Sequence, residues 1–149
     1  MKDSENFDER QLMERGKIFK NALVLLVVFF AADALTNDFG VNWIINSKRA
    51  IVIIAIVCSY SSIRLILKDA YSGKIVNWNV GMIIFSVVGI SLLILNIGEL
   101  IKGNEGLIEN GMLSRLSASL IIAVSFLSIA TVYWYKHFQN KKAELNDSE

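Results

Sequence analysis

Five polar side chains stand out in this 149-residue chain because they interrupt or border long apolar runs. A charged group in a hydrocarbon environment is costly unless it is paired or hydrated. Residues of these types, close together near one end of a set of helices, could form a polar pocket that titrates protons. They could equally be ordinary ion pairs near water. The five candidates for this polar cluster are Asp33, Arg49, Asn96, Glu99 and Arg115.

The spacing of these residues suggests how the charges could be satisfied. Asp33 lies near the end of the first apolar run and Arg49 at the start of the second, so the two can pair across a short loop. Glu99 and Arg115 stand in the same relation between the third run and the fourth. Each lies within about two turns of a helix end, which favours interfacial ion pairs over a buried proton site.

Residues for covalent or metal chemistry are scarce. The chain has one histidine, His137, and one cysteine, Cys58, which we interpret as a small packing residue. Neither has partners at the spacing of a metal site or a catalytic triad. The net charge of +1 gives no basic field for nucleic acid. We therefore predict a protein that is not an enzyme, has no cofactor or metal, and does not bind nucleic acid.

Four apolar runs must position these side chains. Each has 18 to 24 residues and no proline, which is long enough for a helix to cross a hydrocarbon core about 30 Å thick. Backbone N–H and C=O groups in lipid must form hydrogen bonds within the protein, so only helices and closed barrels span a membrane. These runs lack the alternation of polar and apolar residues that barrel strands show. We predict an all-α integral membrane four-helix bundle forming one domain, 1–149. The predicted spans are 18–36, 50–67, 78–101 and 112–135.

Lysine and arginine predict the orientation, because positive charge stays on the cytoplasmic side. Eleven of these residues fall in the two terminal segments and the middle loop, against four at the other two loops. The termini, 1–17 and 136–149, are therefore predicted to be cytoplasmic, with loops 37–49 and 102–111 outside. Ala32-Asp33-Ala34 resembles a signal-peptide cleavage site, but the central acid favours a retained helix.

Small residues predict which helix faces touch. Short loops should make consecutive helices pack as antiparallel neighbours in a compact bundle. Small side chains let helix backbones approach closely in lipid, so ordinary helix packing is favoured over a polar conduit. The predicted contact faces are Ala55, Cys58, Ser59 and Ser62; Gly81, Phe85, Gly89, Leu92, Asn96 and Glu99; and Ser114, Ala118, Ser125 and Ser128.

The polar N-terminal segment predicts a helix that runs into the first span. Asn6 and Glu9 have the spacing of a capping box, which places the start near Phe7. The motif Asp8-Glu9-Arg10-Gln11 follows there. A short chain that opens with D-E-R-Q and continues into four spans resembles uncharacterised small integral membrane proteins of Gram-positive bacteria. The resemblance implies membrane-bound regulation or immunity to peptide toxins, with the motif as a cytoplasmic contact site.

A second resemblance is to the small multidrug transporters. They also have four short helices and use one carboxylate in the first span to couple protons to drug, as Asp33 in Ala31-Ala32-Asp33-Ala34 would. Here the acid is near the helix end and the characteristic proline is absent. The leading prediction is thus a regulatory, accessory or immunity-type protein of the cell membrane. It would act through contacts with the lipid bilayer, a membrane protein or a second copy of itself. The alternative is a proton- or ion-coupled transporter of a small hydrophobic solute.

Overall fold

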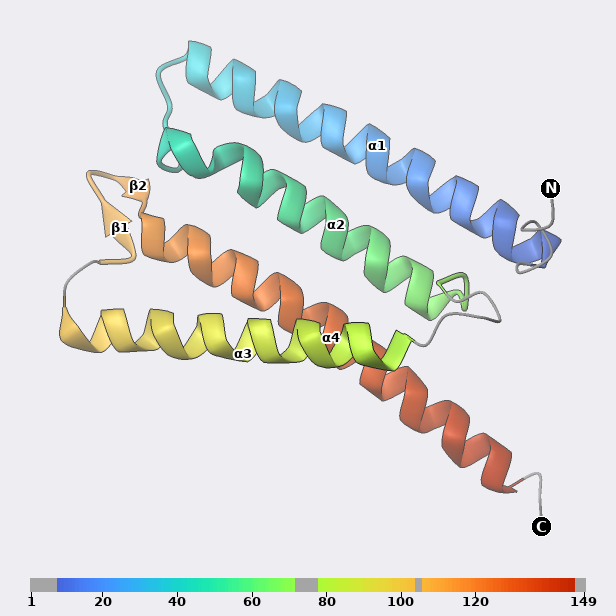
Figure 1. Cartoon of the computed structure of the whole chain (residues 1–149). Helices are drawn as coiled ribbons and strands as arrows, with labels where there is room; N and C mark the ends of the chain where they lie inside the picture. Colours follow the sequence, from blue (N-terminus) through green and yellow to red (C-terminus); the bar gives the residue numbers. More distant parts are fainter. Residues whose placement is uncertain (1–7, 72–77, 104–105, 147–149) are drawn as a thin grey trace.

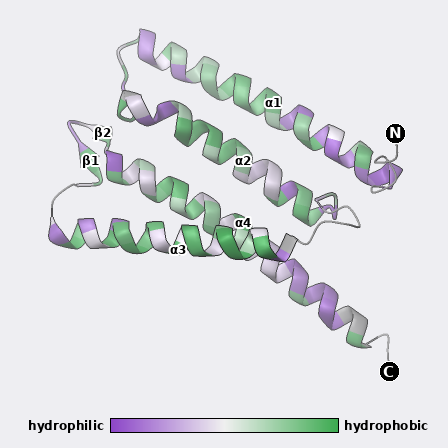
Figure 2. Ribbon diagram, in the orientation of Figure 1, coloured by the Kyte–Doolittle hydropathy of each residue, from purple (hydrophilic) through white to green (hydrophobic). Residues whose placement is uncertain are grey.

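The computed structural model describes residues 8–71, 78–103 and 106–146. These contain four α-helices: α1, Glu9–Asp38; α2, Arg49–Leu67; α3, Trp78–Lys102; and α4, Arg115–Asn146 (Figure 1). All four are long and apolar enough to cross a membrane. The prediction of an all-α chain with four such helices is confirmed. Figure 2 shows apolar residues along the middle of the helices and polar residues gathered toward helix ends.

Helix α1 begins two residues later than predicted. Its N-cap is Asp8, and the Gln11 side chain accepts a hydrogen bond from the Asp8 backbone N–H at 3.3 Å. The capping box is therefore made within the D-E-R-Q motif, whereas Asn6 lies outside the described residues. The prediction that one helix continues from this cap through Ile18 into the first span is confirmed.

The fourth span differs from the prediction at its start and its end. Met112–Leu113 forms strand β2, which pairs antiparallel with β1, Ile108–Glu109, so the helix does not begin at Met112. Ser114 precedes α4, and its hydroxyl accepts the Ser117 N–H at 3.3 Å. Helix α4 then continues to Asn146, so most of the predicted tail is helical.

The two loops at this end of the molecule are joined to each other. Leu113 N–H donates to the Trp43 carbonyl at 2.9 Å, and Ile45 N–H donates to the Leu113 carbonyl at 3.3 Å. Ile44 between them is fully buried and packs with Val52 and Ala118. A short 3₁₀ turn, η2 (Asn46–Lys48), leads from this junction into α2. The junction fixes the first loop against the start of α4 and so brings α4 beside α2.

The helices pack in the order α1–α2–α4–α3. The extensive contacts are between α1 and α2, α2 and α4, and α3 and α4. The expectation that α2 and α3 would be packed neighbours is wrong, because α4 lies between them as their shared partner (Figure 1). The structure is therefore a more open array than the predicted compact bundle. The start of α1 and the end of α4 lie toward the same end, and the hairpin lies toward the other.

The helix contact predicted at Gly89 is confirmed, whereas Gly81 on the same predicted face has open space around it. A Cβ built on Gly89 of α3 would lie 2.9 Å from the Leu127 side chain of α4, so these helices meet where only glycine fits. Toward the other end, Ile66 and Ile129 are buried in one cluster. Large apolar side chains such as Leu95 of α3 stay exposed, as expected of helix faces in contact with lipid.

Candidate functional site

The structure contains the predicted Asp33–Arg49 ion pair. Arg49 Nη1 lies 3.8 Å from Asp33 Oδ1, and Trp43 Nε1 donates to the same oxygen at 2.6 Å. Asp33 comes from the last turns of α1, Trp43 from the following loop, and Arg49 is the first residue of α2. The loop folds back so that both donors reach one carboxylate. The group is referred to below as the Asp33–Arg49 clamp.

Arg49 is almost wholly committed to this clamp. Its residue is 7% exposed, and its guanidinium also donates to Asn37 Oδ1 at 3.1 Å, to Asn42 Oδ1, and to the Ile44 carbonyl at 3.3 Å. A cation is unfavourable at the positive end of a helix, where Arg49 lies. One carboxylate and three neutral acceptors compensate it, so the arrangement holds the first loop rather than leaving a charge free for chemistry.

The other three candidates form no hydrogen bond or ion pair with the described residues of the clamp, and Arg115 lines a cavity together with Lys48. Asn96 is buried on α3, and its Nδ2 donates to Leu92 O at 2.6 Å and to Ser119 Oγ of α4 at 2.9 Å. Glu99 forms an ion pair with Lys102 on its own helix at 3.2 Å, instead of the expected bond with Arg115. The structure therefore divides the predicted five-residue cluster into separate groups with different partners.

Three members of the clamp were missed from the sequence. They are Asn37, Asn42 and Trp43, which were not among the predicted site residues. The sequence did contain a signal for them, because a tryptophan and two asparagines lie in the short segment between Asp33 and Arg49. Such side chains can satisfy the remaining donors and acceptors of a buried pair.

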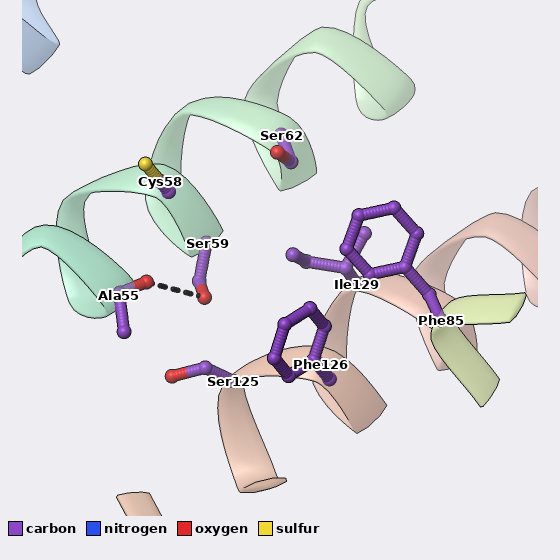
Figure 3. A pocket seen from close by; sticks show the side chains of 8 residues that line it. All are labelled: Ala55, Cys58, Ser59, Ser62, Phe85, Ser125, Phe126 and Ile129. Carbon is purple, nitrogen blue, oxygen red and sulfur yellow. Dashed lines mark hydrogen bonds between the residues drawn. The ribbon is translucent and has the colours of Figure 1, made fainter. Parts of the chain in front are cut away.

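A cleft opens in the middle of the helices, between α2 and α4, with Phe85 of α3 also lining it (Figure 3). Its volume is about 120 Å³. A second cavity of about 110 Å³ shares Ser62, Phe85 and Ile129 with it and continues toward Tyr71. The lining of the first is Ala55, Cys58, Ser59, Ser62, Phe85, Ser125, Phe126 and Ile129.

The hydroxyls in this cleft differ in their hydrogen bonds. Ser59 Oγ donates to the Ala55 carbonyl of its own helix at 2.7 Å. Ser62 of α2 and Ser125 of α4 have no side-chain hydrogen bond within the described part of the chain. An unbonded hydroxyl away from water is costly, and serine in membrane helices commonly bonds across to another helix. Cys58 is exposed at the cleft rather than packed inside, contrary to our interpretation.

A second polar network lies at the opposite end from the clamp. Gln11 Nε2 donates to the Asp69 carbonyl at 2.8 Å, and Lys136 Nζ contacts Asp69 Oδ2 at 2.7 Å. Asp69 follows α2, so its turn connects the start of α1 to α4. Burial raises the pKa of nearby Tyr71, and the charges of Tyr133 and Asp69 add to the effect.

The four residues of the D-E-R-Q motif differ in their contacts. The Gln11 side chain accepts from the Asp8 backbone at the helix cap and donates to the Asp69 carbonyl. Asp8, Glu9 and Arg10 are exposed at the start of α1. These three side chains are accessible to another molecule.

Comparison with known proteins identified no relative. No family model, curated protein or solved structure matches this chain. Among the described residues, no three histidine, cysteine, aspartate or glutamate side chains are grouped as a metal site would require.

Proposed function

We propose that this protein is a non-enzymatic component of a bacterial cell membrane and acts by binding a helix of another membrane protein. The single observation that carries the proposal is the cleft between α2 and α4, where the hydroxyls of Ser62 and Ser125 form no hydrogen bond with the described part of the chain. Small side chains on the cleft wall permit close backbone approach, and hydroxyls give a partner helix polar groups to bond. Both are features of helix-binding surfaces in lipid.

The open helix order supports the same proposal. α1 and α3 each have one extensive helix neighbour, so the array does not close around its own cleft. The cleft lies at the middle of the helices, where water is not available to the hydroxyls. A partner helix would cover this surface and satisfy Ser62 and Ser125 at the same time.

Orientation and the N-terminal motif extend the proposal to the cytoplasm. We place both termini there, because eleven of fifteen lysines and arginines belong to that side. The exposed Asp8, Glu9 and Arg10 then form a cytoplasmic contact surface. The D-E-R-Q resemblance to uncharacterised Gram-positive membrane proteins supports a regulatory, accessory or immunity-type role. If alanine at all three positions leaves every interaction unchanged, this part of the proposal is wrong.

Photo-crosslinking in living bacteria tests the central part. A photoreactive amino acid replaces Ser62 in the cleft, and in a matched chain it replaces the adjacent Ser61, whose hydroxyl bonds to its own helix at 3.0 Å. We expect a discrete protein adduct from position 62 and none from position 61. Ser125→Ala should weaken the adduct at 62. Equal adducts at both positions, or none at 62, would reject the cleft as the binding surface. An adduct of two tagged copies would identify the partner as a second copy.

The transport alternative remains a prediction from the sequence. Asp33 already accepts a hydrogen bond from Trp43 and pairs with Arg49, so its carboxylate is engaged within the chain. The alternative requires pH-dependent flux in liposomes that Asp33→Asn or Glu99→Gln abolishes. Absence of flux by the wild-type protein would reject it.

A further inference from the structure

A third cavity lies at the hairpin end of the molecule, apart from the central cleft. It has a volume of about 240 Å³ and is lined by Lys48, Leu92, Arg115, Ala118, Ser119 and Ile122. These residues come from the start of α2, from α3, and from the first turns of α4. The cavity is far larger than the roughly 10–15 Å³ needed for one water molecule and smaller than the roughly 300–1,000 Å³ of drug-sized sites. It has room for a headgroup.

The charges in this cavity are of one sign. Among the described residues, Lys48 and Arg115 are the charged residues of its lining, and no carboxylate lines it. Within the described residues, neither cationic side chain has an ion pair or hydrogen bond. Asp33 is engaged with Arg49, and Glu99 with Lys102. The other described acids close in sequence, Asp38 and Glu109, form no ion pair with either cation. The two cations therefore share a cavity that no described carboxylate of the chain lines.

Helix ends increase this imbalance. Lys48 is the N-cap of α2 and has no side-chain capping bond, while Arg115 is the first residue of α4. The N-terminus of a helix carries partial positive charge, so cations there are disfavoured and an anion is favoured. The two cations and the two helix ends therefore point to an anionic occupant.

The lining of the cavity changes from charged to apolar along α4. Arg115 is the first residue of α4, and Ile122 lies seven residues further along the helix, about 10 Å at 1.5 Å per residue. Leu92 of α3 and Ile122 are the large apolar side chains of the lining. Ser119 lies between Arg115 and Ile122 on α4; its hydroxyl accepts from Asn96 and has no acceptor of its own among the described residues. A lining that is charged at one end and apolar at the other matches a ligand with a charged headgroup and an apolar chain.

We propose that this cavity binds the phosphate of an anionic phospholipid in the outer leaflet, with Lys48 and Arg115 holding the phosphate and Leu92 and Ile122 contacting the start of an acyl chain. The proposal rests on the membrane location within the proposed function, but not on a partner protein. Purified protein therefore tests it separately from the crosslinking experiment.

Native mass spectrometry of the protein in detergent provides the test, with phosphatidylglycerol and phosphatidylcholine added in parallel. We expect wild-type protein to retain phosphatidylglycerol in preference to phosphatidylcholine. Lys48→Gln and Arg115→Gln should each weaken that binding about fivefold, the effect of one basic residue near an anionic membrane surface. The double variant should weaken it more than twentyfold. The matched control is Lys102→Gln, which removes an exposed cation at the same end but outside the cavity.

A second variant separates charge from shape. Leu92→Phe adds bulk to the cavity wall without changing charge, and it should also reduce phosphatidylglycerol binding. Circular dichroism checks that each variant keeps its helices. Unchanged lipid binding by the double variant, or an equal loss in Lys102→Gln, would overturn the proposal. Displacement of the lipid by millimolar inorganic phosphate would overturn the lipid assignment, because the site would then hold the free anion.

Discussion

Replacing Arg49 by methionine should destabilise the fold more than removing any exposed cation. Methionine keeps most of the side-chain volume and removes every donor. The substitution removes the ion pair with Asp33 and the hydrogen bonds to Asn37, Asn42 and the Ile44 carbonyl. The loop between α1 and α2 would then lose the side chain that donates to all of these groups.

The magnitude follows from the burial of the pair. Removing one partner of a buried ion pair costs about 3–5 kcal/mol, because the other charge is left uncompensated. The Asp33 side chain is 17% exposed and keeps its bond from Trp43, so we expect the lower end, about 3 kcal/mol. Asp33→Asn should cost less, because Arg49 retains three oxygen acceptors. The double variant should cost less than the sum, since the two residues interact directly.

Unfolding in mixed detergent micelles, followed by circular dichroism, measures these free energies. Lys102→Met is the matched control: its side chain is 65% exposed and its ion pair with Glu99 should contribute under about 1 kcal/mol. Trp43 fluorescence should change in Arg49→Met, because the indole shares the carboxylate with Arg49. A loss of stability no greater than that of the control would refute the clamp.

Other substitutions test packing and titration. Gly89→Ala places a Cβ 2.9 Å from the Leu127 side chain and should cost about 1–3 kcal/mol in the same unfolding assay; Gly81→Ala, with open space around it, should be near neutral. Asn96→Leu removes the bond between α3 and α4 and should cost about 1 kcal/mol or less by that assay. Tyr71 should titrate above its usual pKa of 10.0, because the folded protein favours the neutral phenol. Its contribution to the free energy of unfolding is therefore complete below pH 10 and is lost as the pH rises through the raised pKa. Absorbance titration of the wild type against Tyr71→Phe checks this. A normal Tyr71 titration, a harmless Gly89→Ala or a strongly destabilising Asn96→Leu would contradict the contacts described.

The fold could be predicted from the sequence where the signal is local. Apolar length gave four helices, and the capping box needed only a shift from Asn6 to Asp8. The contact between Gly89 and Leu127 follows the same logic, because small residues allow close approach. These properties depend on residues near one another in the chain.

The helix order could not be obtained in this way. It depends on the two bonds between Leu113 and the first loop, which place α4 beside α2. Neither Met112 nor Leu113 carries a signal for a strand inside an apolar run. A pairing between segments about seventy residues apart has no local pattern.

The candidate site was predictable in part for the same reason. Asp33 and Arg49 were expected to pair, because a short loop joins their helices. Glu99 and Arg115 had the same arrangement, yet Glu99 bonds to Lys102 one turn away. A partner on the same helix is held nearby by geometry, whereas a partner across a loop depends on how the loop folds.

The proposed function and the proposed lipid site both require four helices that cross the membrane, with both ends of the chain in the cytoplasm. Cysteine accessibility tests this most directly, in a chain whose native Cys58 is replaced by alanine. Glu109→Cys in the hairpin and Gln139→Cys near the end of α4 are treated with a membrane-impermeant maleimide on intact cells. We expect labelling at position 109 in intact cells, and at position 139 only after permeabilisation. Labelling of 139 in intact cells, or of 109 only after permeabilisation, would contradict it.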